Sequence, residues 1–179
     1  VTDFITSGED IEFKGGTLHV TATGAKIATS NGAVTVNSVD GTEDETFEID
    51  AGSGAVSVGR IGGTNSSGEG IHSVAITSSH ATGITLSGNI TTSNAANNNI
   101  TLTGPVVISG TVALDTDPGS TQDGTITFTS TIRGDGDAAT TDNLDIETGS
   151  GTLTFNASTI IGGADKPLAT LDINNTGGT

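Results

Sequence analysis

Short apolar-polar-apolar triplets recur along the whole chain and are the most regular feature of its sequence. The clearest triplets are at 18–20, 34–36, 47–49, 56–58, 74–76, 84–86, 100–102, 112–114, 126–128, 144–146, 153–155 and 171–173. Such alternation predicts short strands, each with one buried face and one solvated face. Clusters of Gly, Asn and Asp separate the triplets, as turns do, and no window carries a helical stripe. The chain is therefore predicted to be all-β.

Two segments repeat each other and indicate how the strands are arranged. Residues 47–58 read FEIDAGSGAVSV and residues 144–155 read LDIETGSGTLTF, with the same chemical type at ten of the twelve positions. A further triplet begins 27 residues after the first in both cases, at Val74 and Leu171, and other triplets are separated by 22, 20 and 27 residues (84 to 106, 106 to 126 and 126 to 153). A recurrence of about 20–28 residues with two or three strands predicts one coil of a parallel β-solenoid, in which stacked coils share a core.

An antiparallel β-sandwich is the main alternative, because it also has short alternating strands. The chain has 5 Phe and neither Trp nor Tyr. Sandwich cores are usually built around larger aromatic side chains, whereas a narrow solenoid interior suits Val, Ile and Leu. The composition of the core positions therefore favours the solenoid.

The segment 144–174, LDIETGSGTLTFNASTIIGGADKPLATLDIN, resembles the strand repeats of filamentous-haemagglutinin-like and autotransporter-like bacterial surface and secreted proteins. The resemblance is good at 47–76 and degraded at 84–132. It implies a right-handed parallel β-helix in an extracellular or cell-surface adhesin, stalk or fibre, with cell-surface or matrix glycans as candidate partners.

The two ends of the chain bear on its partners. Neither end shows an obvious polar cap, and the final INNTGGT reads as a turn that leads towards another coil. We expect residues 1–179 to form one solenoid domain. Because the ends of a solenoid expose unpaired strand edges, we expect this domain to continue into flanking repeats or to stack end to end with itself.

The composition narrows the function further. The chain contains 27 Gly, 33 Thr and 17 Ser, and its 21 acidic residues against 5 basic ones give a formal charge of −16. Nucleic acids and anionic membrane surfaces both require a basic footprint, so neither is an expected partner. No apolar run is long enough to span a bilayer, which excludes insertion by a helix. The absence of Cys excludes disulfides and thiolate chemistry.

Reactive residues are few, and no enzyme is expected. His19, His72 and His80 occupy polar or outward positions, and no nucleophile elbow accompanies them. Arg60 and Arg133 follow strand triplets and are expected to pair with acidic neighbours. A polysaccharide-active β-helix enzyme is the remaining catalytic alternative, but the chain offers neither Trp nor Tyr as a sugar platform.

Acidic turns give the sharpest site hypothesis, which is calcium binding. Three aspartates lie between the triplets at 112–114 and 126–128, and three more lie in the next long turn; they are Asp115, Asp117, Asp123, Asp135, Asp137 and Asp142. Stacking of coils would let their oxygens gather around Ca²⁺, which prefers 6–8 oxygen ligands. A ligand- or glycan-binding module with Ca²⁺ in these turns is thus the alternative function, and a solvated acidic surface is the simpler interpretation.

Two further motifs lie in the turns. Arg133-Gly134-Asp135 matches the integrin-binding tripeptide, a weak match in a chain so rich in Gly and Asp. Residues 94–99 read NAANNN, and Asn at solenoid turns can stack in ladders or adopt the left-handed conformation. We therefore expect a structural role for these asparagines.

Overall fold

The fold is all-β, as predicted, and the strands pair in parallel. The computed structural model describes residues 3–21, 23–41, 45–63, 70–119, 123–139, 141–156, 160–162 and 166–176. The strands are β1 (Asp3–Ile5), β2 (Ile11–Phe13), β3 (Leu18–Val20), β4 (Ala25–Ala28), β5 (Val34–Gly41), β6 (Glu45–Asp50), β7 (Val56–Ile61), β8 (Ile71–Thr77), β9 (Ile84–Leu86), β10 (Ile90–Thr91), β11 (Ile100–Thr103), β12 (Val106–Ile108), β13 (Thr111–Asp115), β14 (Ile126–Phe128), β15 (Ile132–Gly134), β16 (Asn143–Gly149), β17 (Leu153–Phe155) and β18 (Thr170–Asn175). The described part contains no helix that could cross a membrane.

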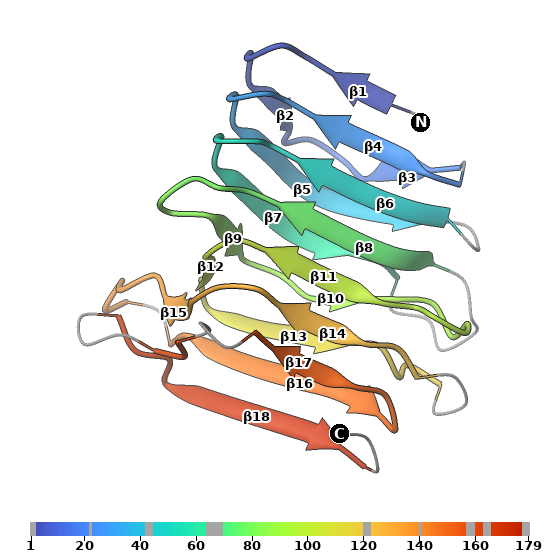
Figure 1. The fold of residues 1–179 in the computed structure, drawn as a ribbon, viewed down its shortest axis with the longest axis vertical. Coiled ribbons are helices and arrows are strands. Elements are labelled where there is room, and N and C mark those ends of the chain that lie inside the picture. Colours follow the sequence, from blue (N-terminus) through green and yellow to red (C-terminus); the bar gives the residue numbers. More distant parts are fainter. Residues whose placement is uncertain are drawn as a thin grey trace.

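Parallel strands stack into a β-solenoid of about 6 turns, with the first strand at one end and the last at the other (Figure 1). Three ladders run along its length. Face A is formed by β1, β4, β6, β8, β11, β14 and β17. Face B is formed by β2, the first halves of β5 and β7, β9, β12 and β15. Face C is formed by β3, the second halves of β5 and β7, β10, β13, β16 and β18.

The strand register confirms most of the stacking predicted from triplet spacing. The predicted neighbours Phe47 and Val74, Ile84 and Val106, Ile126 and Leu153, and Leu144 and Leu171 are all paired. The interval from 106 to 126 is the exception, because β12 lies on face B and β14 lies on face A. Loops of different length project from the corners, so the interval between triplets alone does not identify which face a strand joins.

Apolar side chains of successive turns form continuous columns inside the solenoid. One column on face A consists of Phe4, Ile27, Ile49, Ile76, Leu102, Phe128 and Phe155. Its members in the central turns are fully buried, whereas the partly buried hydrophobic residues that pack against the core all belong to the first and last turns (Phe4, Phe13, Leu18, Leu153, Phe155, Leu168 and Leu171). The core is therefore closed along its length, and its apolar side chains are less buried in the first and last described turns.

The two repeated sequence segments occupy different places in the coil. Residues 47–58 run from β6 on face A to β7 on face B, whereas residues 144–155 run from β16 on face C to β17 on face A. Their shared Gly-Ser-Gly makes the same corner in both places. Gly52 and Gly149 have φ of 55° and 53°, and the amide two residues later donates to the carbonyl of Ala51 or Thr148, at 2.8 and 2.7 Å. The repeated sequence therefore specifies one type of corner and not a whole coil.

Buried hydroxyl groups close the corners. The hydroxyl of Thr29 donates to the carbonyl of Gly32 at 2.5 Å, that of Thr92 to Asn98 at 3.0 Å, and that of Thr116 to Gly124 at 3.3 Å. These bonds bridge corners that differ in length. A polar group buried in this way would be costly without a hydrogen bond. Small polar residues thus let the core continue past loops of variable length.

The asparagine-rich segment has the structural role that its sequence predicts, with a different bonding pattern. Asn97 adopts the left-handed conformation, with φ of 66°. The buried Asn98 amide donates to the carbonyl of Ser93 at 2.8 Å and to that of Thr116, in the next turn, at 2.7 Å. The amide of Asn98 therefore links two turns through the backbone.

Alanine substitutions at two corner glycines should differ in cost. A Cβ at Gly52 would lie 2.1 Å from the carbonyl oxygen of Ser30, whereas a Cβ at Gly110, with φ of 84°, meets nothing within 4 Å. Gly110→Ala should cost about 1–2 kcal/mol of unfolding free energy through backbone strain alone. Gly52→Ala should cost about 2–5 kcal/mol, because the clash with the neighbouring turn adds to the strain. Urea unfolding followed by circular dichroism measures both; equal losses would contradict the close approach.

Candidate functional site

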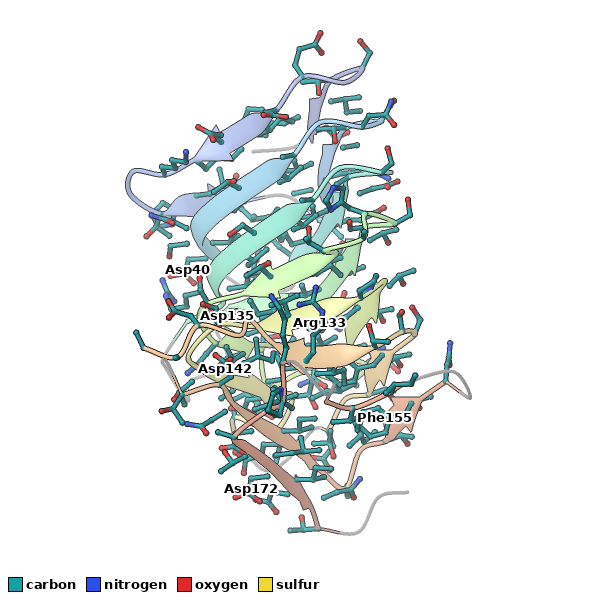
Figure 2. The ribbon with its side chains drawn as sticks, turned by 90° about the vertical axis from the view of Figure 1, so that its left-hand side faces the viewer. Asp40, Arg133, Asp135, Asp142, Phe155 and Asp172 are labelled. Carbon is teal, nitrogen blue, oxygen red and sulfur yellow. The ribbon has the colours of Figure 1, made fainter. Side chains whose placement is uncertain are left out.

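The six aspartates of the calcium hypothesis fall at two separate corners. Asp115 ends β13, and Asp117 and Asp123 lie in the turn from face C to face A. Asp135, Asp137 and Asp142 lie between β15 and β16, in the turn from face B to face C (Figure 2). The two sets lie at opposite ends of β16. Asp142 directly precedes this strand, and Asp115 pairs with Glu147 near the end of the strand, so the length of β16 separates the sets.

The first set contains a close pair of carboxylates. Side-chain oxygens of Asp117 and Asp123 each lie 2.5 Å from the position that a Cβ of Gly149 would occupy, so a side chain at this position would require both carboxylates to move. Asp123 also accepts hydrogen bonds from the amide of Ser150, at 3.0 Å, and from its hydroxyl. The Ser150 hydroxyl is the main cause that holds the pKa of Asp123 below its ordinary value, and Asp117 contributes as well. This pair therefore anchors the corner at Gly149.

The second set is held by its own corner and by the corner of the preceding turn. The buried Asp142 accepts hydrogen bonds from the amides of Gly110, at 2.9 Å, and Asp135, at 3.0 Å. Asp135 in turn accepts from the Ser109 hydroxyl and the Asp137 amide, both at 2.7 Å. The carboxylate of the Arg-Gly-Asp tripeptide is thus engaged by its own corner and by Ser109 of the preceding turn, which argues against the integrin-like interpretation.

Calcium binding stays a prediction from the sequence. Within the described ranges, no three or more His, Asp or Glu side chains are placed to hold one metal ion together. The arrangement that comes nearest is the Asp117 and Asp123 pair above Gly149. Two carboxylates supply fewer oxygens than the 6–8 that Ca²⁺ prefers, so further ligands would have to be water or backbone carbonyls.

Acidic side chains stack on the outer surface of face C. Asp115 pairs in register with Glu147, and Asp145 pairs with Asp172. Burial and, after it, neighbouring like charges raise the pKa of both Asp115 and Glu147. Like charges directly opposite each other destabilise a sheet. The predicted site residues did not include Asp145, Glu147 and Asp172. The matching LDI triplets at 144–146 and 171–173 could have indicated that two of these carboxylates, Asp145 and Asp172, stack on each other.

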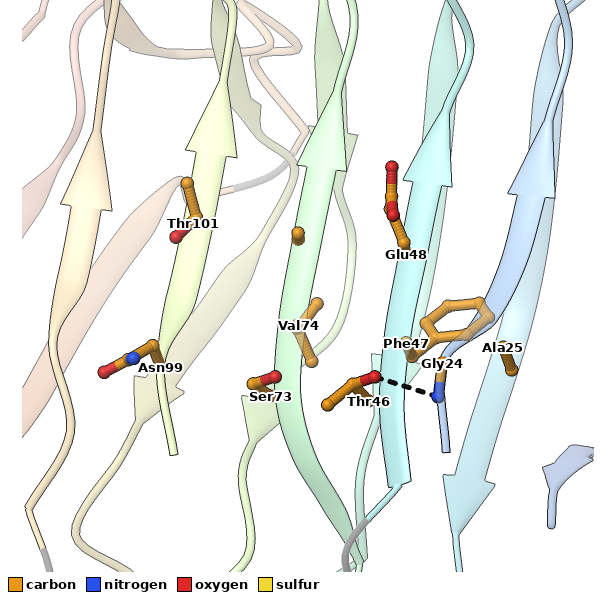
Figure 3. Close-up of a pocket in the computed structure, with 10 residues that line it drawn as sticks. Gly24, Ala25, Thr46, Phe47, Glu48, Ser73, Val74, Asn99 and Thr101 are labelled. Atoms are coloured by element: carbon orange, nitrogen blue, oxygen red, sulfur yellow. Dashed lines mark hydrogen bonds between the residues drawn. The ribbon is translucent and has the colours of Figure 1, made fainter. Parts of the chain in front are cut away.

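A shallow groove crosses the outer surface of face A (Figure 3). It has a volume of about 250 Å³, and its outward-facing lining residues are Thr46, Glu48, Ser73, Ala75, Asn99 and Thr101. The recess arises because the small Ala75 lies in register between Glu48 and Thr101. Glu48 is paired with Lys26 at 2.7 Å, which offsets its charge. The groove offers hydroxyl and amide groups that could hydrogen-bond to a neutral, hydroxyl-bearing ligand.

The histidines and arginines do not assemble into a site. The ring of His72 bonds the carbonyl of Ala96 at 3.0 Å, and that of His80 contacts the Thr82 hydroxyl at 2.6 Å. Arg60 donates to the carbonyl of Gly62 and to the Ser38 hydroxyl. In the part of the chain that the structure describes, the ion pairs belong to Lys14 and Lys26, so the predicted ion pairs of Arg60 and Arg133 are not formed there.

Comparison with known proteins adds no relative to this picture. No protein-family model matches the chain, and no curated protein or solved structure matches it.

The stacked carboxylates of Asp115 and Glu147 on face C predict that mild acid stabilises the fold. The folded state raises the pKa of Asp115 and Glu147 above the ordinary values of 3.8 and 4.5, so it binds their protons more tightly than the unfolded chain does. Stability should therefore rise as the pH falls from neutral through the raised values, and this gain is complete below the ordinary ones. Asp123, whose pKa is lowered, should oppose the gain only below pH 3.8.

Urea unfolding between pH 7.5 and 4.5 measures this dependence. Glu147→Gln should raise stability at pH 7 and reduce the gain on acidification, because it removes one of the stacked charges. Glu9→Gln, which changes an exposed carboxylate in the first turn, is the matched control and should leave the slope unchanged. Stability that falls steadily from pH 7 to 5 would contradict the assignment.

Proposed function

We propose that this chain is a structural β-solenoid segment of an extracellular bacterial surface adhesin, stalk or fibre. Its contribution is length and rigidity rather than catalysis. The observation that carries the proposal is the unbroken stacking of the three parallel ladders over a core that is closed along its length. Each turn makes its main contacts with its two neighbours, which is the architecture of an elongated repeat protein.

The interior supports a rigid element. Ile49, Ile76 and Leu102 are fully buried, and each packs between equivalent side chains of the turns before and after it. Backbone hydrogen bonds between turns run along the solenoid axis and link each rung to the next. Bending would have to separate these bonds on one face while compressing the packed columns on another, at a cost set by the close packing of the interior.

The outer surface supports a role in an aqueous, exposed setting. The formal charge of −16 resides in acidic residues that lie largely on outward rungs and in turns, as at Asp145 and Asp172. A high net charge of one sign keeps proteins soluble and opposes lateral association between strand-rich molecules. The resemblance of residues 144–174 to surface-protein repeats gives the proposal its bacterial, extracellular setting.

Surface labelling of the source cells tests this proposal. Antibodies raised against the folded chain should label intact cells or extracellular material, and mild external protease should remove the label. An antibody against a cytosolic protein of the same cells is the control and should label only after lysis. Recovery of the antigen only from lysed cells would contradict an extracellular role.

A further inference from the structure

We propose that the outer surface of face A binds ice through a regular array of threonine side chains, centred on β11, β14 and β17. Such binding is a second function, beyond the length and rigidity of the solenoid. The ligand is crystalline water, a neutral lattice that offers hydrogen-bond donors and acceptors at fixed spacings.

The array consists of two neighbouring columns of threonines. Along the strands of face A, outward threonines alternate with buried residues such as Ile100, Leu102 and Phe128. The strand register stacks the threonines of successive turns on one another (Figure 1; Thr101 is labelled in Figure 3). One column contains Thr101, Thr127 and Thr154, and the other contains Thr77, Thr103 and Thr129. Together the two columns form a small two-dimensional lattice of identical side chains.

The fold fixes the spacings of this lattice. Adjacent strands lie about 4.7–4.9 Å apart, and outward residues two positions apart in one strand are separated by about 6.6 Å. Threonine is β-branched, so its side chain is restricted at χ1 and holds its methyl and hydroxyl in few orientations. Thr129 is held further, because its hydroxyl accepts a hydrogen bond from the amide of Gly104 at 3.1 Å. The array therefore presents like groups at repeated intervals in two directions.

Hydroxyl groups of the array are available to water. In the described part of the chain, the hydroxyls of four of its threonines have no hydrogen-bond partner in the protein; they belong to Thr101, Thr103, Thr127 and Thr154. Each hydroxyl can donate one hydrogen bond and accept two. Water molecules bonded to them take on the spacings of the array, while the threonine methyls restrict the orientation of the water between them. Ice holds its oxygens at fixed separations of similar size, so water ordered in this way can join its lattice.

The charge distribution favours a neutral ligand. The outward positions of β11, β14 and β17 carry no charged side chain, although the chain has a formal charge of −16. Charges lie elsewhere, as at Glu48 in β6 and at the stacked Asp145 and Asp172 on face C. A charged group holds its own hydration shell and interrupts an ice-like arrangement of water. An uncharged array on an acidic protein is therefore complementary to a neutral lattice and not to an ionic partner.

A crystalline polysaccharide is the other neutral ligand with a repeating surface. Sugar rings usually pack against exposed aromatic side chains, and the chain contains neither Trp nor Tyr. Phe128 and Phe155, which belong to the strands of the array, lie in the interior column of face A and stack on each other there. The threonine surface therefore favours ice, and polysaccharide binding becomes an outcome of the test.

Ice-affinity measurements on the whole chain test the proposal. A growing ice surface should take up the folded chain, and a single ice crystal in its solution should develop facets and freeze below its melting point. Thr127→Glu places a charge at the centre of the array, between Thr101 and Thr154. It should remove most of the uptake and of the gap between melting and freezing. Because Thr127 points outward, urea unfolding should show that the variant keeps its fold.

The matched control is Thr85→Glu. Thr85 is an outward threonine of β9 on face B, with Ser57 and Val107 as its column neighbours. The substitution adds the same charge to another face and should leave both effects on ice unchanged.

Absence of uptake and of faceting with the unsubstituted chain would overturn the proposal, and equal losses from both variants would overturn its assignment to face A. Retention on cellulose or chitin particles that Thr127→Glu abolishes, without any effect on ice, would also overturn it and assign the array to a polysaccharide. Each of these results would leave surface labelling of the source cells, and with it the structural function, unaffected.

Discussion

The structure depends on one constraint: a strand of three residues cannot bury its own apolar face. Each triplet becomes a core element only because a triplet of the next turn lies about 4.8 Å away in register. The fully buried central column members, such as Ile76 and Leu102, show what this stacking achieves. The partly exposed Phe4 and Leu171 show what remains when a neighbour is present on one side only. Stability in this fold is thus a property of neighbouring turns and not of single strands.

The same stacking in register explains why acidic residues in one outward column destabilise the fold. Register places identical positions of successive turns opposite each other, so an acidic residue at an outward position tends to meet its counterpart. Glu147 lies between Asp115 and Asn174 in one column, and the Asn174 amide donates to its carboxylate at 3.2 Å. A charged column of this kind destabilises the fold locally, while it helps to keep the lateral surface in water.

The sequence predicts the fold well because apolar and polar residues alternate with period 2 in each strand and the coils have a nearly constant length. Pairs such as Phe47 with Val74 follow from their spacing, and the stacked partner is the residue observed. The face of the solenoid to which each strand belongs could not be predicted in the same way. The corners at Gly52 and Gly149 share one local structure but join different faces, and no local pattern distinguishes them. The candidate site was predicted less well, since carboxylates such as Asp142 are held by backbone amides that only the folded corner brings near.

Native-state hydrogen exchange of single backbone amides tests the stacking account most directly. If the turns stabilise one another, amides in β8 and β11 should exchange most slowly, and protection should fall step by step towards β1 in one direction and β18 in the other. Equal protection in all turns would contradict this account, as would a maximum at one end.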